Sequence, residues 1–234
     1  MTEPMRLAKY LSHCGICSRK QASRLIDAGV VEVNGRPANH IDHVLPSDVI
    51  FVNGELVTGI CEKQLFAFHK PIGMDCKINA SDPTSIIHAL PSETRLYPIG
   101  RLDKDSRGLI LITNDGDLCH RLNHPEHHVE KEYHVTVDKP LDMDFCHKMA
   151  TGIPIGDQMT WPCEVSLLSE TQFRIVLKQG LNRQIRKMAK YCGYRVIDLQ
   201  RVRIDSLMLE PLALPEGAIQ PLNIHLFDNE RRVD

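Results

Sequence analysis

The feature that most constrains the fold is a short charged loop that runs directly into a strongly apolar segment. Residues 100–108 read Gly-Arg-Leu-Asp-Lys-Asp-Ser-Arg-Gly, and residues 109–112 read Leu-Ile-Leu-Ile. Four consecutive apolar residues predict a strand that is buried on both faces. A charged loop of this kind is often the solvated tip of a hairpin, but on a buried strand it also holds a reactive side chain in one place. We therefore treat its two carboxylates, Asp103 and Asp105, as candidate reactive groups.

The charges of the chain are segregated along the sequence, although they nearly cancel in total. The formal net charge is −2, yet residues 6–24 carry five cations and no acid. Residues 174–203 carry nine cations and one acid, which gives this segment a charge of +8. Such segregation predicts basic surfaces that neutralise phosphates on a protein that is otherwise nearly neutral. A merely solvated basic face is the alternative.

The cysteines and the N-terminal residues bear on the compartment. No run approaches the ~20 apolar residues of a membrane span, and the first residues lack the apolar core of a signal peptide. Eight cysteines at irregular spacing predict reduced thiols rather than a disulfide framework. Cys14 and Cys17 form a lone pair without the second pair that a structural zinc site needs. We expect a cytoplasmic protein with no membrane partner and no bound metal.

The first 57 residues have the pattern of a small α/β module. Leu7, Tyr10 and Leu11 have the spacing of an apolar helix stripe. Ser18 and Gln21 form a capping-box pattern that begins a second helix, which we expect to end at Gly29. Residues 30–33 read as a strand that enters a tight hairpin turn. A module this small buries little surface and gains stability from a neighbour or from RNA.

This module resembles the S4 RNA-binding domain. The resemblance covers residues 5–57 and rests on residues 6–11, 17–22 and 33–35, which read Arg-Leu-Ala-Lys-Tyr-Leu, Cys-Ser-Arg-Lys-Gln-Ala and Val-Asn-Gly. It implies contacts with an RNA backbone from five basic residues: Arg6, Lys9, Arg19, Lys20 and Arg24. We expect an S4-like domain over 1–57, a linker over 58–64 and a catalytic domain over 65–234.

Strands dominate the chain from residue 65 onward. Residues 65–70, 132–137 and 173–178 have strand patterns, and the latter two alternate between apolar and polar residues. The apolar spacing of residues 185–192 predicts a helix, and residues 194–197 and 199–204 read as two further strands. Strand runs with a few interposed helices predict an α+β fold with a mainly antiparallel sheet.

Three motifs in this larger part resemble those of pseudouridine synthases of the RsuA/RluF type. They are Gly-Arg-Leu-Asp at residues 100–103, Lys-Glu-Tyr at 131–133, and Asn-Arg-Gln-Ile-Arg-Lys-Met at 182–188. The resemblance implies that Asp103 is the nucleophile, that Tyr133 stacks on the target base, and that Arg186 is the counter-ion of Asp103. It also implies RNA contacts from residues beside these three: Arg101, Leu102, Lys104, Arg183, Gln184 and Ile185.

The implied reaction is the isomerisation of uridine to pseudouridine in structured RNA, with large-subunit (23S) ribosomal RNA as the expected substrate. The base must be cut from C1′, rotated and rejoined through C5, so no electrons, hydride or phosphate move. We expect no cofactor, because neither a phosphate loop nor a dinucleotide fingerprint occurs. The carboxylate attacks the sugar, attacks the base or removes a ribose proton, and the sequence leaves these three open. We expect a monomer.

Other readings of the same residues remain. The reaction on a tRNA anticodon stem-loop is one, and a non-catalytic RNA-binding ribosome-assembly factor is another. A glycoside hydrolase that uses Asp103 with Asp105 is a third, since paired carboxylates suit that chemistry. The resemblance favours the synthase, because neither rival has a use for all three motifs behind an S4-like module.

Overall fold

The chain forms two compact units in the computed structural model, which describes residues 3–228 of its 234 residues. The first unit comprises Met1–Gln64, Pro91–Leu96 and Asn114–Gly116. The other described residues form the second unit. The domain bounds expected from the sequence stay a prediction, and the residues 1–2 and 229–234 that they include lie outside the described part. Among the described residues, none of the helices has the length and apolar character needed to cross a membrane.

The first unit begins with two short helices, α1 (Leu7–His13) and α2 (Arg19–Asp27). The predicted capping box at the start of α2 is confirmed. The Gln21 N–H donates to Ser18 Oγ at 3.2 Å, and the Ser18 N–H donates to Gln21 Oε1 at 2.9 Å. The helix ends at Asp27, just before Gly29, which has a φ of +68°. This box satisfies backbone donors that the helix leaves unpaired.

Short strands complete the first unit. A pair of strands joins β1 (Met5–Arg6) to β4 (His43–Val44). A four-stranded antiparallel sheet runs in the order β3 (Arg36–Pro37), β2 (Val31–Val33), β5 (Ile50–Val52) and β6 (Glu55–Leu56). The core consists of apolar residues from both helices and these strands, including Leu11, Ala22 and Ile50. Residues 58–64, expected as a linker, make contacts inside this unit, since the Cys61 N–H donates to His13 O at 3.0 Å.

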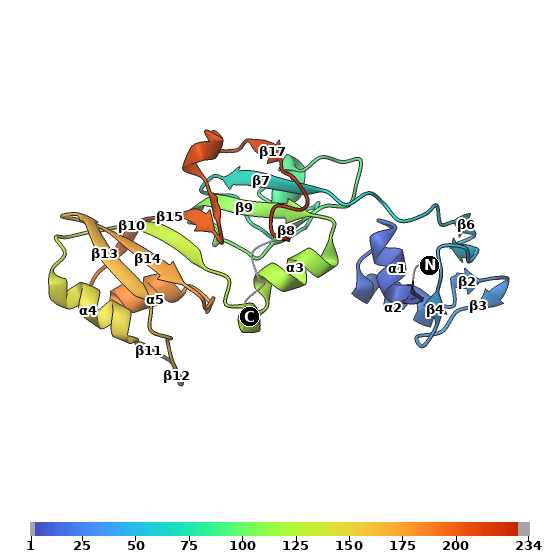
Figure 1. Cartoon of the computed structure of the whole chain (residues 1–234), viewed down its shortest axis with the longest axis horizontal. Coiled ribbons are helices and arrows are strands. Elements are labelled where there is room, and N and C mark those ends of the chain that lie inside the picture. The colour runs from blue at the N-terminus through green and yellow to red at the C-terminus, as the bar shows by residue number, and fades with distance from the viewer. Residues whose placement is uncertain (1–2, 229–234) are drawn as a thin grey trace. The chain divides into compact units, whose positions relative to one another are not determined.

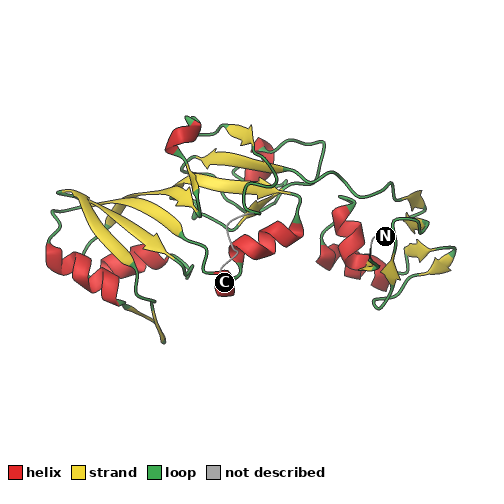
Figure 2. Ribbon diagram, viewed as in Figure 1, coloured by secondary structure: helices red, strands yellow, loops and turns green. Residues whose placement is uncertain are grey.

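The second unit is built on one nine-stranded sheet (Figure 2). Only β15 and β9 pair in parallel among the described strands of this sheet, so the predicted α+β fold with a mainly antiparallel sheet is confirmed. Its main path is β13 (Glu164–Ser169), β14 (Gln172–Leu177), β10 (Lys131–Val137), β15 (Val196–Ile204), β9 (Arg107–Thr113), β7 (Leu65–Lys70) and β17 (Ile219–Pro221). Beside this path, β8 (Tyr97–Ile99) pairs with β9, and β16 (Leu207–Met208) pairs with β15. A separate ribbon pairs β11 (Pro154–Ile155) with β12 (Gln158–Met159).

Helices cover this sheet in two places. Figure 1 shows α4 (Met143–Thr151) and α5 (Gln184–Tyr191) on one side of β10, β13 and β14. There Phe145 and Met188 pack against Val135 and Phe173. Helix α3 (Gly116–Asn123) packs against β9 through Leu118 and Leu122. Three short 3-10 helices lie in the connections: η1 (Ile86–Ala89), η2 (Pro125–His127) and η3 (Glu210–Leu212).

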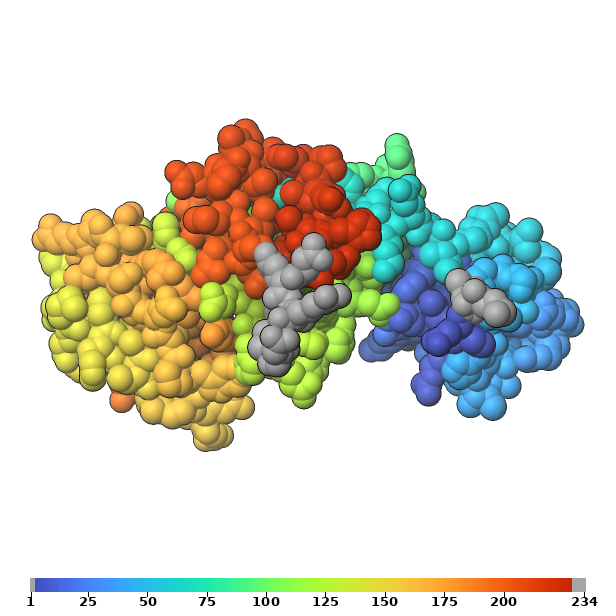
Figure 3. Space-filling model, in the orientation of Figure 1, coloured from blue at the N-terminus to red at the C-terminus, as the bar shows by residue number. Residues whose placement is uncertain are grey.

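Strand β9 lies in the interior of the second unit, as its apolar run predicts. Residues 108–113 are all buried. Gly108 has a φ of +113°, and a Cβ added there would lie 2.2 Å from Arg201 O in β15. Only glycine therefore lets the two parallel strands meet at this point. In the space-filling view (Figure 3), the red C-terminal segment lies on the surface of the second unit, and its Leu209 and Phe227 share a core with Leu109 and Leu111 of β9.

The strand prediction for residues 194–204 differs from the structure in one respect. Two strands were expected, over 194–197 and 199–204, but β15 is one continuous strand from Val196 to Ile204. Asp198, the residue between the two expected strands, is accommodated within β15 by an ion pair with Arg107, whose Nη2 lies 2.8 Å from Asp198 Oδ2. The strand bends through irregularities in its pairing with β10 instead of ending.

A buried carboxylate, that of Glu132, lies on the face of β10 opposite to the face of Tyr133 and Val135. It joins three strands of the sheet. Glu132 Oε1 lies 3.0 Å from Arg174 Nε in β14, and Glu132 Oε2 lies 3.1 Å from Arg203 Nε in β15. Burial by itself raises the pKa of Glu132, but hydrogen bonds from both arginines outweigh it and leave this pKa below its ordinary value.

We expect Glu132→Gln to lower the free energy of unfolding by about 2 kcal/mol at neutral pH, the scale of a lost hydrogen bond to a charged group. Because the folded pKa is the lower one, this contribution is present above the unfolded pKa and fades as pH falls through the folded pKa. Urea unfolding of both proteins between pH 3 and pH 7 measures it. Glu164→Gln, at an exposed partner of Arg174, is the matched control and should change little. A penalty that is equal at all pH values would contradict this account.

Candidate active site

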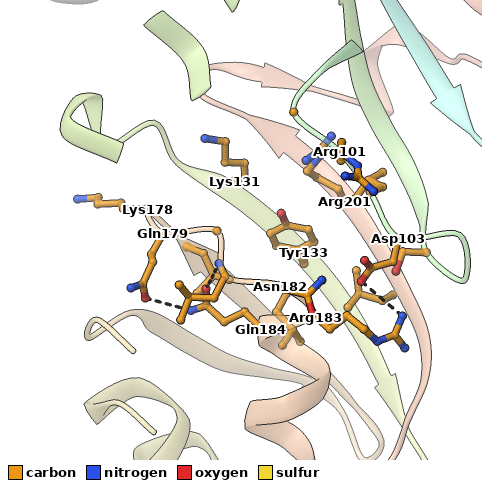
Figure 4. Close-up of a pocket in the computed structure, with 18 of the residues that line it drawn as sticks. Arg101, Asp103, Lys131, Tyr133, Lys178, Gln179, Asn182, Arg183, Gln184 and Arg201 are labelled. Carbon is orange, nitrogen blue, oxygen red and sulfur yellow. Dashed lines mark hydrogen bonds and ion pairs between the residues drawn. The ribbon is translucent and has the colours of Figure 1, made fainter. Parts of the chain in front are cut away.

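A pocket of about 620 Å³ opens on the second unit where the charged loop, β10, β15 and the start of α5 converge (Figure 4). All three catalytic candidates from the sequence, Asp103, Tyr133 and Arg186, line it. These residues come from a loop, a strand and a helix that lie far apart in the sequence. The other polar side chains along its wall are Arg101, Ser106, Asn123, His124, Lys131, Trp161, Lys178, Gln179, Asn182, Arg183, Gln184 and Arg201.

A buried lysine, Lys70, holds the backbone of the charged loop. Lys70 is fully buried, and its Nζ donates to Ser106 O at 2.7 Å and to Pro71 O at 2.9 Å. Burial lowers the pKa of Lys70. The Ser106 N–H in turn donates to Asp103 O at 3.0 Å, and the Leu102 N–H donates to Cys76 Sγ at 3.3 Å. The backbone on both sides of Asp103 is therefore held in place.

The carboxylate of Asp103 is one-third exposed and faces a cation. Arg183 Nη1 lies 3.8 Å from Asp103 Oδ2, and the side chain of Asp103 is 34% exposed. Arg183 is itself held by a bidentate ion pair, with its Nη1 and Nη2 at 2.9 Å and 2.8 Å from the two oxygens of Asp105. This hydrogen bonding by Arg183, together with the nearby charge of Arg186, lowers the pKa of Asp105. Asp105 thus positions the guanidinium that faces Asp103.

The expected pairing of Arg186 with Asp103 does not occur in this structure. Arg186 Nη2 donates to Asp105 O at 2.6 Å and to Ser106 Oγ at 3.1 Å, and its Nε lies 3.4 Å from Asp105 Oδ2. The reason is the helix start: α5 begins after Arg183, which has a left-handed φ of +52°, and Arg186 lies almost one turn farther along. Arg183 therefore reaches the Asp103 side chain, while Arg186 binds the loop behind it.

Tyr133 and a residue that the sequence analysis missed form the floor of the pocket. Tyr133 in β10 pairs in register with Arg201 in β15, and Figure 4 shows Tyr133 between Asp103 on one side and Gln179 on the other. Arg201 is only 3% exposed, and its Nε donates to Leu109 O at 2.7 Å. Its Nη2 is buried without a hydrogen-bond partner in the described part of the chain. The sequence offered one signal for this residue: Arg201 lies two positions after Leu199, so the two side chains share one face of a strand.

The remaining candidates divide by location. Leu102, Gln184 and Ile185 are buried in the pocket wall, where Gln184 Oε1 accepts from the Leu181 N–H at 2.9 Å. Arg101 is exposed along the wall, whereas the Lys104 Nζ donates to Thr84 Oγ1 at 2.9 Å and does not line the pocket. The five N-terminal cations belong to the first unit; Lys9 is half-buried, and the exposed ones are Arg6, Arg19, Lys20 and Arg24.

Comparison with known proteins decides what this pocket belongs to. Residues 64–191 match the family of RNA pseudouridylate synthases, and residues 5–50 match the S4 domain. The chain belongs to the RNA pseudouridylate synthase family. It is therefore a pseudouridine synthase, an isomerase that converts uridine in RNA to pseudouridine, and it carries an S4 RNA-binding module ahead of the catalytic part.

Individual relatives of this pseudouridine synthase agree. It is 43% identical over 214 residues to the dual-specificity RNA pseudouridine synthase RluF of Escherichia coli K12, covering 91% of this chain and 74% of the relative. It is 34% identical to the ribosomal large subunit pseudouridine synthase B of Bacillus subtilis, covering 88% of each chain. A crystal structure of a pseudouridylate synthase superimposes with a TM-score of 0.69 at 30% identity, covering 94% of this chain and 96% of that one.

The pocket of this synthase suits an isomerisation that takes place within one site. The base must leave C1′, turn and rejoin through C5 without escaping, so the wall must hold it while the bond is open. A carboxylate that acts as a nucleophile or base must be ionised, and Asp103 lies beside the guanidinium of Arg183. A uridine also has to leave its stack to enter such a pocket, at a cost of a few kcal/mol.

Proposed function

We propose that this synthase isomerises a uridine of large-subunit ribosomal RNA, with Asp103 as its nucleophile. The observation that carries the assignment of Asp103 is its place in the pocket: it lines the wall, faces Arg183 and sits on a loop fixed by Lys70. Asp105 also lies on this loop, but its two oxygens are both engaged by Arg183. Asp103 is thus the carboxylate with room for a substrate.

The other residues take complementary roles. Tyr133 stacks on the flipped uracil and recovers roughly 1–3 kcal/mol of the unstacking cost. Arg183 faces the carboxylate of Asp103, and Arg186 positions the loop by binding Asp105 O and Ser106 Oγ. Arg201 presents a buried, unpaired donor to the base or the sugar. We propose that the chain works as a monomer and in the cytoplasm, where its eight free thiols stay reduced.

The large-subunit assignment rests on the relatives and has a direct test. Transcripts of 23S rRNA, 16S rRNA and a set of tRNAs, each made with uridine tritiated at C5, are incubated with the enzyme. Forming the C1′–C5 bond releases this tritium to water, whereas a glycoside hydrolase would leave an abasic site. We expect release from the 23S transcript. Release only from the 16S transcript would contradict the large-subunit assignment. An absence of release from every transcript would favour a non-catalytic RNA-binding protein such as an assembly factor.

A second substrate is supported by one observation. The E. coli relative bears the name of a dual-specificity enzyme, and it covers 91% of this chain. We propose a tRNA anticodon stem-loop as the second RNA. Release of tritium from a tRNA transcript in the same experiment is the expected result, and a tRNA series without any release would restrict the enzyme to ribosomal RNA.

The first unit should supply affinity rather than base identity. The exposed cations Arg19, Lys20 and Arg24 all lie on α2, and phosphate contacts fix register without reading sequence. Replacing these three with Gln should weaken binding to the modified transcript and lower the log–log salt slope by roughly 0.7–0.9 for each lost contact. Fluorescence anisotropy across a salt series measures this, with Lys148→Gln, an exposed change on α4, as the control. An unchanged slope would mean that α2 contacts something other than RNA.

A further inference from the structure

The end of the pocket away from Asp103 carries an exposed aromatic side chain that the proposed reaction does not use. Trp161 is the only tryptophan of the chain, it lines the pocket, and it is 40% exposed. The backbone N–H of Trp161 donates to Gln179 Oε1 at 3.0 Å. Figure 4 places Gln179 and Lys178 on the opposite side of Tyr133 from Asp103. Trp161 therefore belongs to the far end of the pocket.

The side chain of Trp161 is exposed, but the backbone on both sides of it is held by hydrogen bonds. Before it, Thr160 is buried, donates its N–H to Ile153 O at 3.0 Å and accepts the Ile153 N–H on its Oγ1 at 2.9 Å. After it, Pro162 fixes φ, and the Cys163 N–H donates to Ala150 O at 2.9 Å. The backbone of Trp161 is therefore held in place while the indole is exposed to solvent. Ordering this side chain when a ligand binds costs little conformational entropy.

A second ring backs the indole. The His128 ring lies 5.4 Å from the Trp161 ring, centroid to centroid, at an interplanar angle of 54°. His128 has a left-handed φ of +49° and donates its N–H to Pro125 O at 3.1 Å, which sets its direction. The histidine therefore supports one side of the indole, and the exposed remainder faces the pocket.

We propose that Trp161, backed by His128, stacks with a nucleobase next to the target uridine in the RNA. This inference rests on the proposed function, in which the target base itself lies between Asp103 and Tyr133. A pocket of about 620 Å³ is larger than one uridine needs, so a neighbouring nucleotide has room at the far end. The cation of Lys178 there suits its phosphate. Every base has a face that stacks on an aromatic ring, and an open indole at the rim of an RNA site provides such a surface.

The single tryptophan makes the test direct. The RNA transcript that the enzyme modifies is titrated into the wild-type protein, and fluorescence excited at wavelengths that tyrosine does not absorb reports Trp161 alone. We expect saturable quenching. In steady-state tritium release, Trp161→Ala should raise KM by about 10-fold or more, the scale of one lost stacking contact, and leave kcat within twofold. Trp161→Phe should recover most of the loss, and Met159→Ala, an exposed apolar change two residues away and outside the pocket, should change neither constant.

An abasic nucleotide identifies the stacked base. Replacing one flanking nucleotide by its abasic form should raise KM for the wild-type enzyme as much as Trp161→Ala does, and should add nothing to that variant. If the enzyme is active but Trp161→Ala leaves KM unchanged and RNA does not quench the fluorescence, the stacking site is wrong and the proposed function stands. Quenching by the 23S transcript without tritium release from any RNA would overturn the proposed function and leave Trp161 as an RNA contact. Neither quenching nor release would overturn both.

Discussion

Asp103→Asn should abolish pseudouridine formation, lowering the single-turnover rate by more than about 10⁴-fold, the scale of losing a covalent catalytic group. The substitution keeps the size of the side chain and its ability to accept hydrogen bonds but removes the negative charge that attack or proton removal requires. The loop itself should persist, because Lys70 and Arg186 hold its backbone rather than this side chain. Tritium release at saturating RNA measures the rate, and anisotropy should show RNA affinity within twofold of wild type.

Asp105→Asn is the matched comparison for this prediction. It lies on the same loop and also lacks its charge, but in the wild type it serves to hold Arg183. We expect a loss of about 10-fold, since a guanidinium released from Asp105 no longer keeps its place beside Asp103. Equal loss in the two variants would mean that the carboxylates have been ranked wrongly. Appreciable turnover by a well-folded Asp103→Asn protein would contradict the nucleophile.

Arg186→Ala should lower turnover by roughly 10²–10³-fold, as expected when one preorganised donor is removed from a catalytic site. Arg186 is 14% exposed and gives two donors to the loop, so its loss lets Asp103 move away from the reacting position. The effect should fall on the rate at saturating RNA. Lys187→Ala, an exposed change on the same helix, is the control. A change in RNA affinity alone, with an unaltered rate, would make Arg186 a phosphate contact.

The sequence predicts those parts of the fold and site that depend on neighbouring residues. The capping box at Ser18 is local, and its outcome needs no knowledge of the rest of the chain. The buried strand after the loop follows from four adjacent apolar side chains. The family resemblance then names Asp103, Tyr133 and Arg186, and the fold brings these three to one pocket.

The pairings within the site depend on contacts between distant segments. Asp105 and Arg183 are 78 positions apart, and nothing in either neighbourhood states which arginine of α5 meets which carboxylate of the loop. That choice follows from the left-handed backbone at Arg183, which sets where the helix begins. Arg201 and Trp161 were missed for a related reason. In the sequence, Arg201 looks like one more cation in a basic segment. Only the register of β15 against β10 shows that it lies at the pocket beside Tyr133.

The central claim is that this protein forms pseudouridine in large-subunit ribosomal RNA through Asp103, and mapping the RNA of living cells tests it most directly. Carbodiimide mapping is applied to ribosomal and transfer RNA from cells that lack the protein, and from the same cells complemented with wild type or Asp103→Asn. The account predicts at least one pseudouridine of the large-subunit RNA that is missing without the protein, restored by wild type and not by Asp103→Asn. A large-subunit pattern that is identical in all three strains, or one that Asp103→Asn restores, would contradict it.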